Sequence, residues 1–160
     1  MTQTIHIEPL SEQAFRPFGD VIETSGAPSM MINQGMCERY HDIPSLDFQN
    51  GRAGISLFHG QPYDLPLKLA LMERHPLGSQ AFIPMSPDPF LVIVAEDQNG
   101  PHNIRAFLTN GTQGVNYARN IWHGVLTPLN GPRLFAVIDR IGDGNNLEEH
   151  HFDTPPTITP

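Results

Sequence analysis

Short apolar runs, separated by Gly and Pro, recur along the chain from residue 53 onward. Each run spans roughly four to eight residues and is bounded by turn-forming residues, a pattern typical of β-strands. Residues 67–72 would also fit a helical turn, so the type of that element stays open. The predicted strands are residues 53–58, 65–72, 80–83, 90–95, 103–109, 115–117, 122–126 and 133–141. Roughly eight or nine short strands with few helices indicate a β-sandwich or a β-barrel.

The N-terminal part of the chain is less regular. Residues 4–7 predict an edge strand, and residues 20–23 predict another short strand. Between them, Ser11 can cap a short helix that runs through Phe15 and is ended by the proline and glycine that follow. Residues 24–36 have no steady hydrophobic period, and we expect them to form a loop.

The chain changes character near its C-terminal end. We expect one barrel domain over residues 1–142 and a polar, Pro-rich tail over residues 143–160, loosely attached to the barrel. His150 and His151 are adjacent in this tail, so on a strand their side chains would point in opposite directions. The pair therefore predicts no joint site.

Composition narrows the classes of function. The chain contains 16 Pro and 14 Gly, which argues against long helices. Its formal net charge is −8 with only 9 Lys plus Arg, and no basic run is present, which argues against duplex nucleic acid and anionic membranes as partners. Cys37 is the single cysteine, so neither an internal disulfide nor a Cys-based metal motif is available. The start lacks the features of a signal peptide, and no apolar run approaches the roughly 20 residues that span a membrane, so we expect a soluble cytoplasmic protein.

The candidate chemistry is concentrated in residues 73–85. Glu73 and His75 are two positions apart, so on a strand their side chains share one face. A Pro-Leu-Gly-Ser turn follows, and a symmetric hairpin would place His75 opposite Gln80 and Glu73 opposite Phe82. One sheet face would then carry a carboxylate, an imidazole and an amide, which is a candidate for metal ligation or for acid–base catalysis.

Two further stretches carry polar groups. His123 lies beside Trp122 after a Gly-rich turn, and in a small barrel it could reach the same lumen as the first cluster. Residues 38–42, Glu-Arg-Tyr-His-Asp, allow two interpretations. They form either a solvated charged bend or a flap that carries contacts to a substrate.

The spacing of Glu73, His75 and Gln80, with His123 far downstream, resembles the two-motif metal site of the cupin superfamily. Glu73 stands where the first His of that motif would be, and Gln80 stands where its Glu would be. Longer strings resemble the ureidoglycolate lyase family, formerly called ureidoglycolate hydrolase, over roughly residues 5–141. These strings are residues 9–23, 38–42, 73–85, 114–117, 122–123 and 138–140.

The resemblance implies a cupin-like double-stranded β-helix, or jelly-roll, barrel that forms a homodimer. It implies cleavage of (S)-ureidoglycolate to glyoxylate and urea in allantoin degradation, with a divalent metal ion, nickel, as a candidate cofactor. Such a lyase must remove a proton from the substrate hydroxyl, return one to the departing nitrogen and hold the carboxylate.

The metal or acid–base cluster is expected to consist of Glu73, His75, Gln80 and His123. With a metal, His75 and His123 are the first candidates for ligands; without one, His123 or Glu73 is the base. The expected substrate contacts are Arg39, Arg119 and Arg140 to the carboxylate and Tyr40, His41, Asn116 and Tyr117 to the urea group. Arg74 should point away from Glu73 and His75 and form a salt bridge on the outer face.

Three other functions remain open from the sequence. An amidohydrolase would act on the same substrate and release ammonia and carbon dioxide. A cupin-like binding domain would hold a small acid without converting it. A structural barrel would use His and Glu as satisfied core groups, but it would leave residues 38–42 unexplained.

Overall fold

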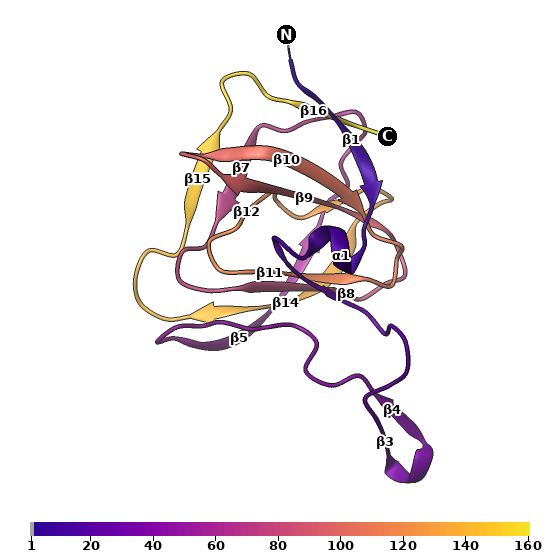
Figure 1. Ribbon diagram of the computed structural model, residues 1–160. Coiled ribbons are helices and arrows are strands. Elements are labelled where there is room, and N and C mark those ends of the chain that lie inside the picture. Colours follow the sequence, from indigo (N-terminus) through magenta and orange to yellow (C-terminus); the bar gives the residue numbers. More distant parts are fainter. Residues whose placement is uncertain (1) are drawn as a thin grey trace.

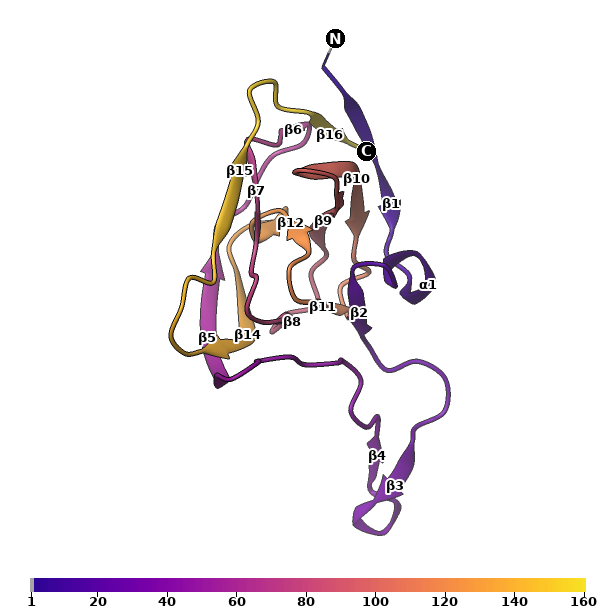
Figure 2. The same ribbon diagram turned by 60° about the vertical axis from the view of Figure 1, so that its left-hand side comes forward.

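The computed structural model describes residues 2–160 as two curled β-sheets that form a cupin-like β-barrel (Figures 1 and 2). The first sheet has nine strands in the order β15-β7-β12-β9-β10-β1-β16-β6, with β13 paired to β9. These strands are β1 (Thr4–Pro9), β6 (Leu67–Lys68), β7 (Leu71–Arg74), β9 (Phe90–Asp97), β10 (Pro101–Leu108), β12 (Trp122–His123), β13 (Thr127–Pro128), β15 (Glu148–His151) and β16 (Thr157–Thr159).

The second sheet has five strands in the order β2-β11-β8-β14-β5. They are β2 (Gly19–Ile22), β5 (Arg52–Gly60), β8 (Gln80–Pro84), β11 (Gly114–Tyr117) and β14 (Arg133–Ile141). All four neighbouring pairs are antiparallel. Side chains of alternate residues therefore point into the barrel or out of it along every strand.

Two small elements complete the fold. Helix α1 (Glu12–Phe15) begins where the Ser11 hydroxyl accepts a hydrogen bond from the amide of Ala14, as the sequence predicts. A two-stranded hairpin, β3 (Met30–Ile32) and β4 (Cys37–Arg39) joined by the 3-10 turn η1 (Asn33–Gly35), projects away from the barrel (Figures 1 and 2). No helix in residues 2–160 is long and apolar enough to span a membrane.

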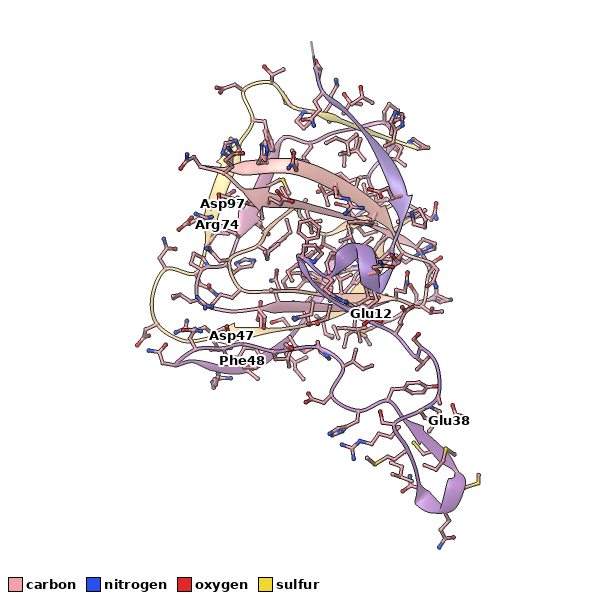
Figure 3. The ribbon with its side chains drawn as sticks, in the orientation of Figure 1. Glu12, Glu38, Asp47, Phe48, Arg74 and Asp97 are labelled. Atoms are coloured by element: carbon pink, nitrogen blue, oxygen red, sulfur yellow. The ribbon has the colours of Figure 1, made fainter. Side chains whose placement is uncertain are left out.

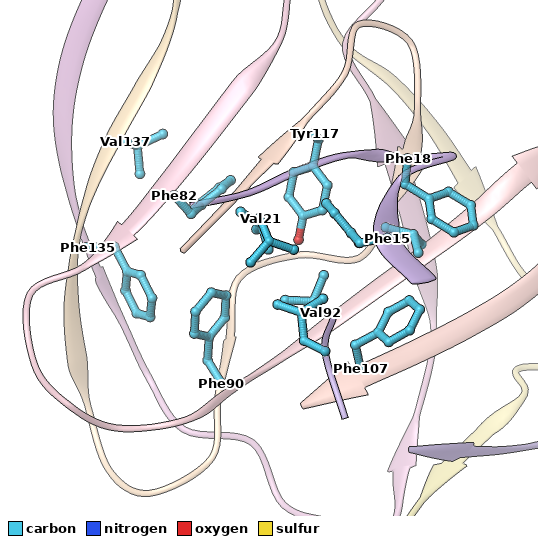
Figure 4. Close-up of a cluster of buried hydrophobic side chains, with 13 residues drawn as sticks. Phe15, Phe18, Val21, Phe82, Phe90, Val92, Phe107, Tyr117, Phe135 and Val137 are labelled. Carbon is cyan, nitrogen blue, oxygen red and sulfur yellow. The ribbon is translucent and has the colours of Figure 1, made fainter. Parts of the chain in front are cut away.

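The core consists of two apolar clusters on the two faces of the nine-stranded sheet. The first lies inside the barrel and is rich in aromatic rings, among them Phe15, Phe82, Phe90, Phe107, Tyr117 and Phe135 (Figure 4). The second lies on the outer face of the sheet and includes Met72, Leu91, Ile93, Trp122 and Ile158. Strand β9 is buried on both faces, which explains its continuous apolar sequence.

Most predicted strands are present, and two of them differ in extent. Residues 65–72 contain two strands, β6 and the start of β7, so the helical alternative is wrong. Residues 122–126 contain only the short strand β12. The prediction of a loop for residues 24–36 is wrong in part, because β3 and η1 lie within that range.

The C-terminal segment differs most from expectation. Strand β15 pairs with β7, and β16 lies between β1 and β6 in the nine-stranded sheet. The side chain of Ile158 is fully buried in the outer cluster, which β16 helps to cover. A loosely attached tail is therefore the wrong description of these strands, and the division of the chain at residue 142 stays a prediction.

Candidate active site

Three titratable side chains meet at one end of the barrel. Glu73 in β7 and His123 in β12 are directly opposite each other in adjacent antiparallel strands. His75 lies just beyond the end of β7, on the same side as Glu73 because side chains alternate. One ligand atom from each of the three residues lies within 4.8 Å of the other two. We call these three residues the cluster.

His75 is held between two hydrogen-bonding groups. Its Nδ1 lies 2.8 Å from the carbonyl oxygen of Asn146, and its Nε2 lies 3.0 Å from Oε1 of Gln80. The amide Nε2 of Gln80 in turn donates to Oδ2 of Asp139 at 3.1 Å. A carbonyl oxygen can only accept, so Nδ1 of His75 carries a proton in this arrangement. The chain of contacts fixes the orientation of the imidazole.

The contact between His75 and Gln80 has a consequence for metal binding. A ring nitrogen that binds a metal ion must present a lone pair to it. Oε1 of Gln80 can likewise only accept, so its 3.0 Å contact with His75 places a proton on Nε2 of the imidazole. Nε2 can bind a metal ion only after it loses this proton and the Gln80 amide turns or moves away. Gln80 thus contacts the cluster and blocks the nitrogen of His75 that could bind a metal ion.

His123, unlike His75, has a ring nitrogen without a protein partner. Its side chain is 1% exposed, its Nδ1 lies 2.9 Å from the carbonyl oxygen of Gly124, and its Nε2 is buried without a protein partner. Burial, aided by the nearby charge of His75, lowers the pKa of His123 to about 3. The imidazole is therefore neutral near pH 7, with its proton on Nδ1 and a free lone pair on Nε2.

Tyr117 and Glu149 lie next to the cluster, and Glu149 affects the pKa of one of its residues. The ring of Tyr117 stacks on His123 with centroids 4.2 Å apart and an interplanar angle of 5°. Burial raises the pKa of the Glu73 carboxyl, and the charge of Glu149 raises it further against the opposing effect of His75. Burial and the charge of Glu73 raise the pKa of the Tyr117 hydroxyl, which stays protonated. The cluster therefore holds one carboxyl with a raised pKa beside the neutral rings of Tyr117 and His123.

The residues of the cluster fit a divalent metal ion. Two imidazoles and a carboxylate are a common donor set for such ions. The unpartnered Nε2 of His123 supports the fit, because a buried polar atom without a partner is costly unless something binds it. Glu73, His75 and His123 would hold the ion, and the amide oxygen of Gln80 could join them once His75 releases it.

The hairpin predicted for residues 73–82 does not form. Strand β7 belongs to the nine-stranded sheet and β8 to the five-stranded sheet, so Glu73 pairs with His123 and Glu149 rather than with Phe82. His75 and Gln80 still meet, because the turn between them crosses from one sheet to the other. The contact was predicted, but for the wrong geometric reason.

Two of the three arginines predicted to bind a carboxylate, Arg119 and Arg140, are occupied within the chain. Arg119 donates to Oδ2 of Asp47 at 3.0 Å. Arg140 is 8% exposed and donates to the carbonyl oxygen of Phe48 at 3.0 Å and to Oδ1 of Asn50 at 2.9 Å. Both side chains therefore fasten the segment that enters β5.

Arg74 lies on the outer face, as predicted. Its guanidinium contacts Glu148 at 2.7 Å and Asp97 at 3.1 Å, and it stacks over the ring of Trp122 with Cζ 4.4 Å from the centroid. The Nε1 of Trp122 also donates to Asp97 at 3.0 Å. This group joins β7, β9, β12 and β15 behind the cluster.

Asn116 and Tyr117 occupy opposite faces of β11. Tyr117 points into the barrel and contacts His123, whereas Asn116 donates to Oδ2 of Asp20 and to the carbonyl oxygen of Ser45, both at 3.1 Å. Tyr117 is therefore placed to meet a ligand at the cluster. Asn116 is not, and its role as a substrate contact stays a prediction.

Arg39, Tyr40 and His41 lie on or beside the projecting hairpin, away from the end of the barrel that carries Arg74 and Asp97 (Figure 3, where Glu38 marks the hairpin). Tyr40 and His41 line a separate surface cavity of about 260 Å³ beside α1 and β2. A single copy of the chain does not bring these three residues to the cluster. Their contact with substrate stays a prediction.

Sequence reasoning missed Asn146. Its carbonyl oxygen binds His75, and its Oδ1 accepts a hydrogen bond from the amide of Leu77 at 2.8 Å. The residue lies in the segment expected to be a tail, and the only available signal was its Asn-Asn turn sequence just before a short strand. Contacts of a backbone carbonyl leave no mark on the sequence.

The chain is similar to known proteins of one family. A family model described as ureidoglycolate lyase matches residues 2–159. A ureidoglycolate lyase of Rhodobacter capsulatus is 56% identical over 155 residues, which cover 96% of each chain. One from Mesorhizobium japonicum is 55% identical over 151 residues, covering 92% of this chain and 93% of the relative. Ureidoglycolate lyase 2 of Rhizobium meliloti is 55% identical over 152 residues, covering 93% of each. The match extends over nearly the full described chain, and the chain belongs to the ureidoglycolate lyase family.

Proposed function

We propose that the cluster of Glu73, His75 and His123 is the active centre of a carbon–nitrogen lyase that cleaves (S)-ureidoglycolate to glyoxylate and urea. The family supports the reaction. The observation that carries the assignment to this place is the meeting of a carboxyl and two imidazoles within 4.8 Å at the end of the barrel. Groups with shifted pKa values in one buried cluster are typical of active sites.

The reaction requires a group that accepts a proton and a group that donates one. The substrate hydroxyl loses its proton, its oxygen forms the carbonyl of glyoxylate, and the electron pair of the C–N bond leaves with the urea nitrogen. That nitrogen then takes up a proton, so no water is consumed. One base and one acid, placed on the two sides of the reacting carbon, are sufficient.

Glu73 is the better candidate for the base. Its raised pKa brings the carboxylate closer to the pH at which the enzyme works, which improves proton transfer. The low pKa of His123, about 3, makes its imidazole a weak base but a good neutral acceptor or metal ligand. His75 is then the group that returns a proton to the departing nitrogen, with the substrate taking the place of Gln80.

A divalent metal ion, nickel, is the alternative way in which the cluster could activate the substrate. Glu73, His75 and His123 would then hold the ion instead of moving protons, and the ion would supply Lewis-acid chemistry toward the hydroxyl and carboxylate of the substrate. The buried free Nε2 of His123 supports this choice. The substrate contacts proposed are Tyr117 at the cluster and Arg39, Tyr40, His41, Asn116, Arg119 and Arg140 as predicted from the sequence.

We further propose that the protein is a homodimer in the cytoplasm and serves allantoin degradation. The family resemblance supports the homodimer and the pathway. Membership of a family of metabolic enzymes supports the location.

Product analysis tests the reaction. Purified, chelator-treated protein is incubated with (S)-ureidoglycolate, with and without added nickel, and urea, ammonia and glyoxylate are measured against the uncatalysed decay. Urea and glyoxylate in equal amounts are expected, at a rate that rises with nickel. Ammonia in place of urea would identify an amidohydrolase, and no turnover under either condition would favour a binding domain.

A further inference from the structure

The projecting hairpin, residues 30–39, is held only at its base; we call it the arm. The amide of Ser29 donates to the carbonyl oxygen of Arg39 at 2.8 Å, and the amide of His41 donates to Oγ of Ser29 at 3.1 Å. The hydroxyl of Tyr40 donates to the carbonyl oxygen of Gly26 at 3.2 Å. These contacts fix the direction in which the arm leaves the barrel (Figure 2).

The arm exposes three methionine side chains to solvent. Met30, Met31 and Met36 are 43%, 52% and 86% exposed. A single two-stranded hairpin is marginally stable at best in water and needs packing against another surface. Methionine is a flexible side chain that fills irregular apolar gaps at binding surfaces. The arm therefore has the features of a segment that packs against a partner.

A second exposed apolar surface lies on the outside of the five-stranded sheet. Leu57 in β5 and Ile83 in β8 both pair with Ala136 in β14, so the three side chains form one row across the sheet. The face also carries Ile55 and Met85, which are 75% and 56% exposed. We call this surface the sheet face.

The sheet face continues into a groove. The groove has a volume of about 530 Å³, and the apolar part of its lining includes Ile22, Ile43, Ile83, Pro84 and Met85. A contiguous apolar face with an adjoining groove is typical of a site for protein–protein contact.

We infer that the arm of one chain docks on the sheet face of a second copy, and that the second arm docks reciprocally on the first. The proposal rests on the homodimer proposed above and names its contact surface. Because each chain presents one arm and one face, exchange between two copies closes a two-fold dimer and leaves neither surface uncovered. Met36, at the tip of the arm, would occupy the groove of the partner.

Charge favours a second copy as the occupant. Two chains with a net charge of −8 repel each other, so a stable contact must avoid acidic surface. Glu38 and Arg39 cancel each other within the arm, and the row across Leu57, Ala136 and Ile83 is uncharged. The groove carries one acidic side chain, Glu23, which accepts a hydrogen bond from the amide of Gln113. Reciprocal exchange gives two arm-to-face contacts in each dimer. The second contact brings the buried area closer to the roughly 800 Å² per partner that stable interfaces need.

Cys37 provides a direct test, because it is the single cysteine of the chain and lies on the arm. Three variants, Ile55→Cys, Leu57→Cys and Ile83→Cys, each place a thiol on the sheet face. After mild oxidation, at least one of them is expected to form a disulfide-linked dimer on a non-reducing gel, with Cys37 joined to the new cysteine in mass-spectrometric peptides. Leu147→Cys is the matched control, because Leu147 is 44% exposed but lies outside the sheet face.

No disulfide to Cys37 from any of the three positions would overturn the proposal, and so would equal cross-linking of Leu147→Cys. Linkage within a single chain would also overturn it, because the arm would then fold back on its own sheet. A dimer that persists in solution while none of the three positions links would mean that the homodimer uses another surface.

Sedimentation of Met36→Glu gives a second measurement. Burying this charge in an apolar groove is expected to raise the dimer dissociation constant about 100-fold or more, whereas Leu147→Glu is expected to leave it unchanged. Urea release is measured on the same samples, since Met36 lies outside the cluster. Loss of the dimer is thereby distinguished from failure of the proposed lyase reaction. An unchanged dissociation constant in Met36→Glu would overturn the docking of the arm tip.

Discussion

The two faces of the strand pair β7 and β12 differ in whether their polar side chains have partners within the chain. On the outer face, Arg74 is paired with Glu148 and Asp97 and stacked on Trp122. On the inner face, Glu73 has a raised pKa, and His123 keeps a buried Nε2 without a partner. Paired charges stabilise a fold, whereas a buried polar atom without a partner is tolerated where a ligand completes its contacts. Side-chain alternation along this strand pair thus places a paired charge on one face and the proposed active centre on the other.

The largest effect is expected from removing the charge of Glu73. Glu73→Gln should lower kcat for urea release by about 100-fold to 10,000-fold, because the amide cannot accept the hydroxyl proton. Glu149→Gln is the matched control, since Glu149 is the direct cross-strand neighbour of Glu73 on β15 and is exposed. It acts on Glu73 through its charge alone, so we expect a far smaller change in kcat. A kcat for Glu73→Gln within a few-fold of the parent protein would assign the base elsewhere.

His123 should affect both turnover and stability. His123→Ala is expected to lower turnover on the order of 100-fold while the far-ultraviolet circular dichroism stays unchanged. In chelator-treated parent protein, the neutral imidazole contributes stability that is fully present above pH 6.5 and is lost as pH falls toward its folded pKa of about 3. Between pH 7.5 and 5 the loss is about 2 kcal/mol.

Urea unfolding at both pH values measures this loss, and the variant should lack it. The raised pKa of Glu73 acts with the opposite sign. Its protonated form contributes stability that is present below the unfolded pKa and is lost as pH rises through the folded one. An identical pH dependence in the parent and in His123→Ala would contradict the assignment to His123.

A smaller effect is expected from Asn146, which positions His75 from the segment before β15. Asn146→Ala removes the acceptor for the amide of Leu77 and should loosen the carbonyl that holds Nδ1 of His75. We expect kcat to fall about tenfold with little change in KM, and nickel affinity to fall by a similar factor. Asn145→Ala is the control, because Asn145 binds only the nearby amide of Leu147. Equal losses in both variants would mean that the loop as a whole, rather than Asn146, matters.

The smallest effect on activity is expected from the outer face. Arg74→Met should lower the free energy of unfolding by about 1–2 kcal/mol through loss of the ion pairs and the stacking on Trp122. Its kcat should stay within a few-fold of the parent. Denaturant unfolding and steady-state urea release measure the two quantities. A loss of turnover as large as that of Glu73→Gln would show that the two faces are not independent.

The sequence predicts the barrel well because strand signals are local. Apolar runs ended by Gly and Pro mark β5, β8, β9 and β14, and alternation correctly places Arg74 opposite in direction to Glu73 and His75. The pairing of β7 was not readable, because the strand is too short for its partners to follow from its pattern. The turn after His75 resembles a hairpin but joins two sheets.

The C-terminal segment shows the other limit of sequence reasoning. Residues 143–160 are polar and Pro-rich, yet β15 and β16 complete the nine-stranded sheet. Their stability depends on pairing with β7 and β1, far away in the sequence, rather than on local propensity. The position of Asn146 beside His75 follows from that long-range pairing, and for this reason it could not be predicted.

The late position of Asn146 and β15 in the chain has a consequence for synthesis. A nascent polypeptide that has emerged only as far as residue 142 already contains Glu73, His75 and His123, but it lacks the carbonyl that holds His75 and the strand that covers β7. Translation must proceed past residue 151, and the ribosomal tunnel must release that stretch, before the imidazole of His75 can be held in this orientation. We expect a product truncated within this region to lack the contact that orients His75, although it contains all three residues of the cluster.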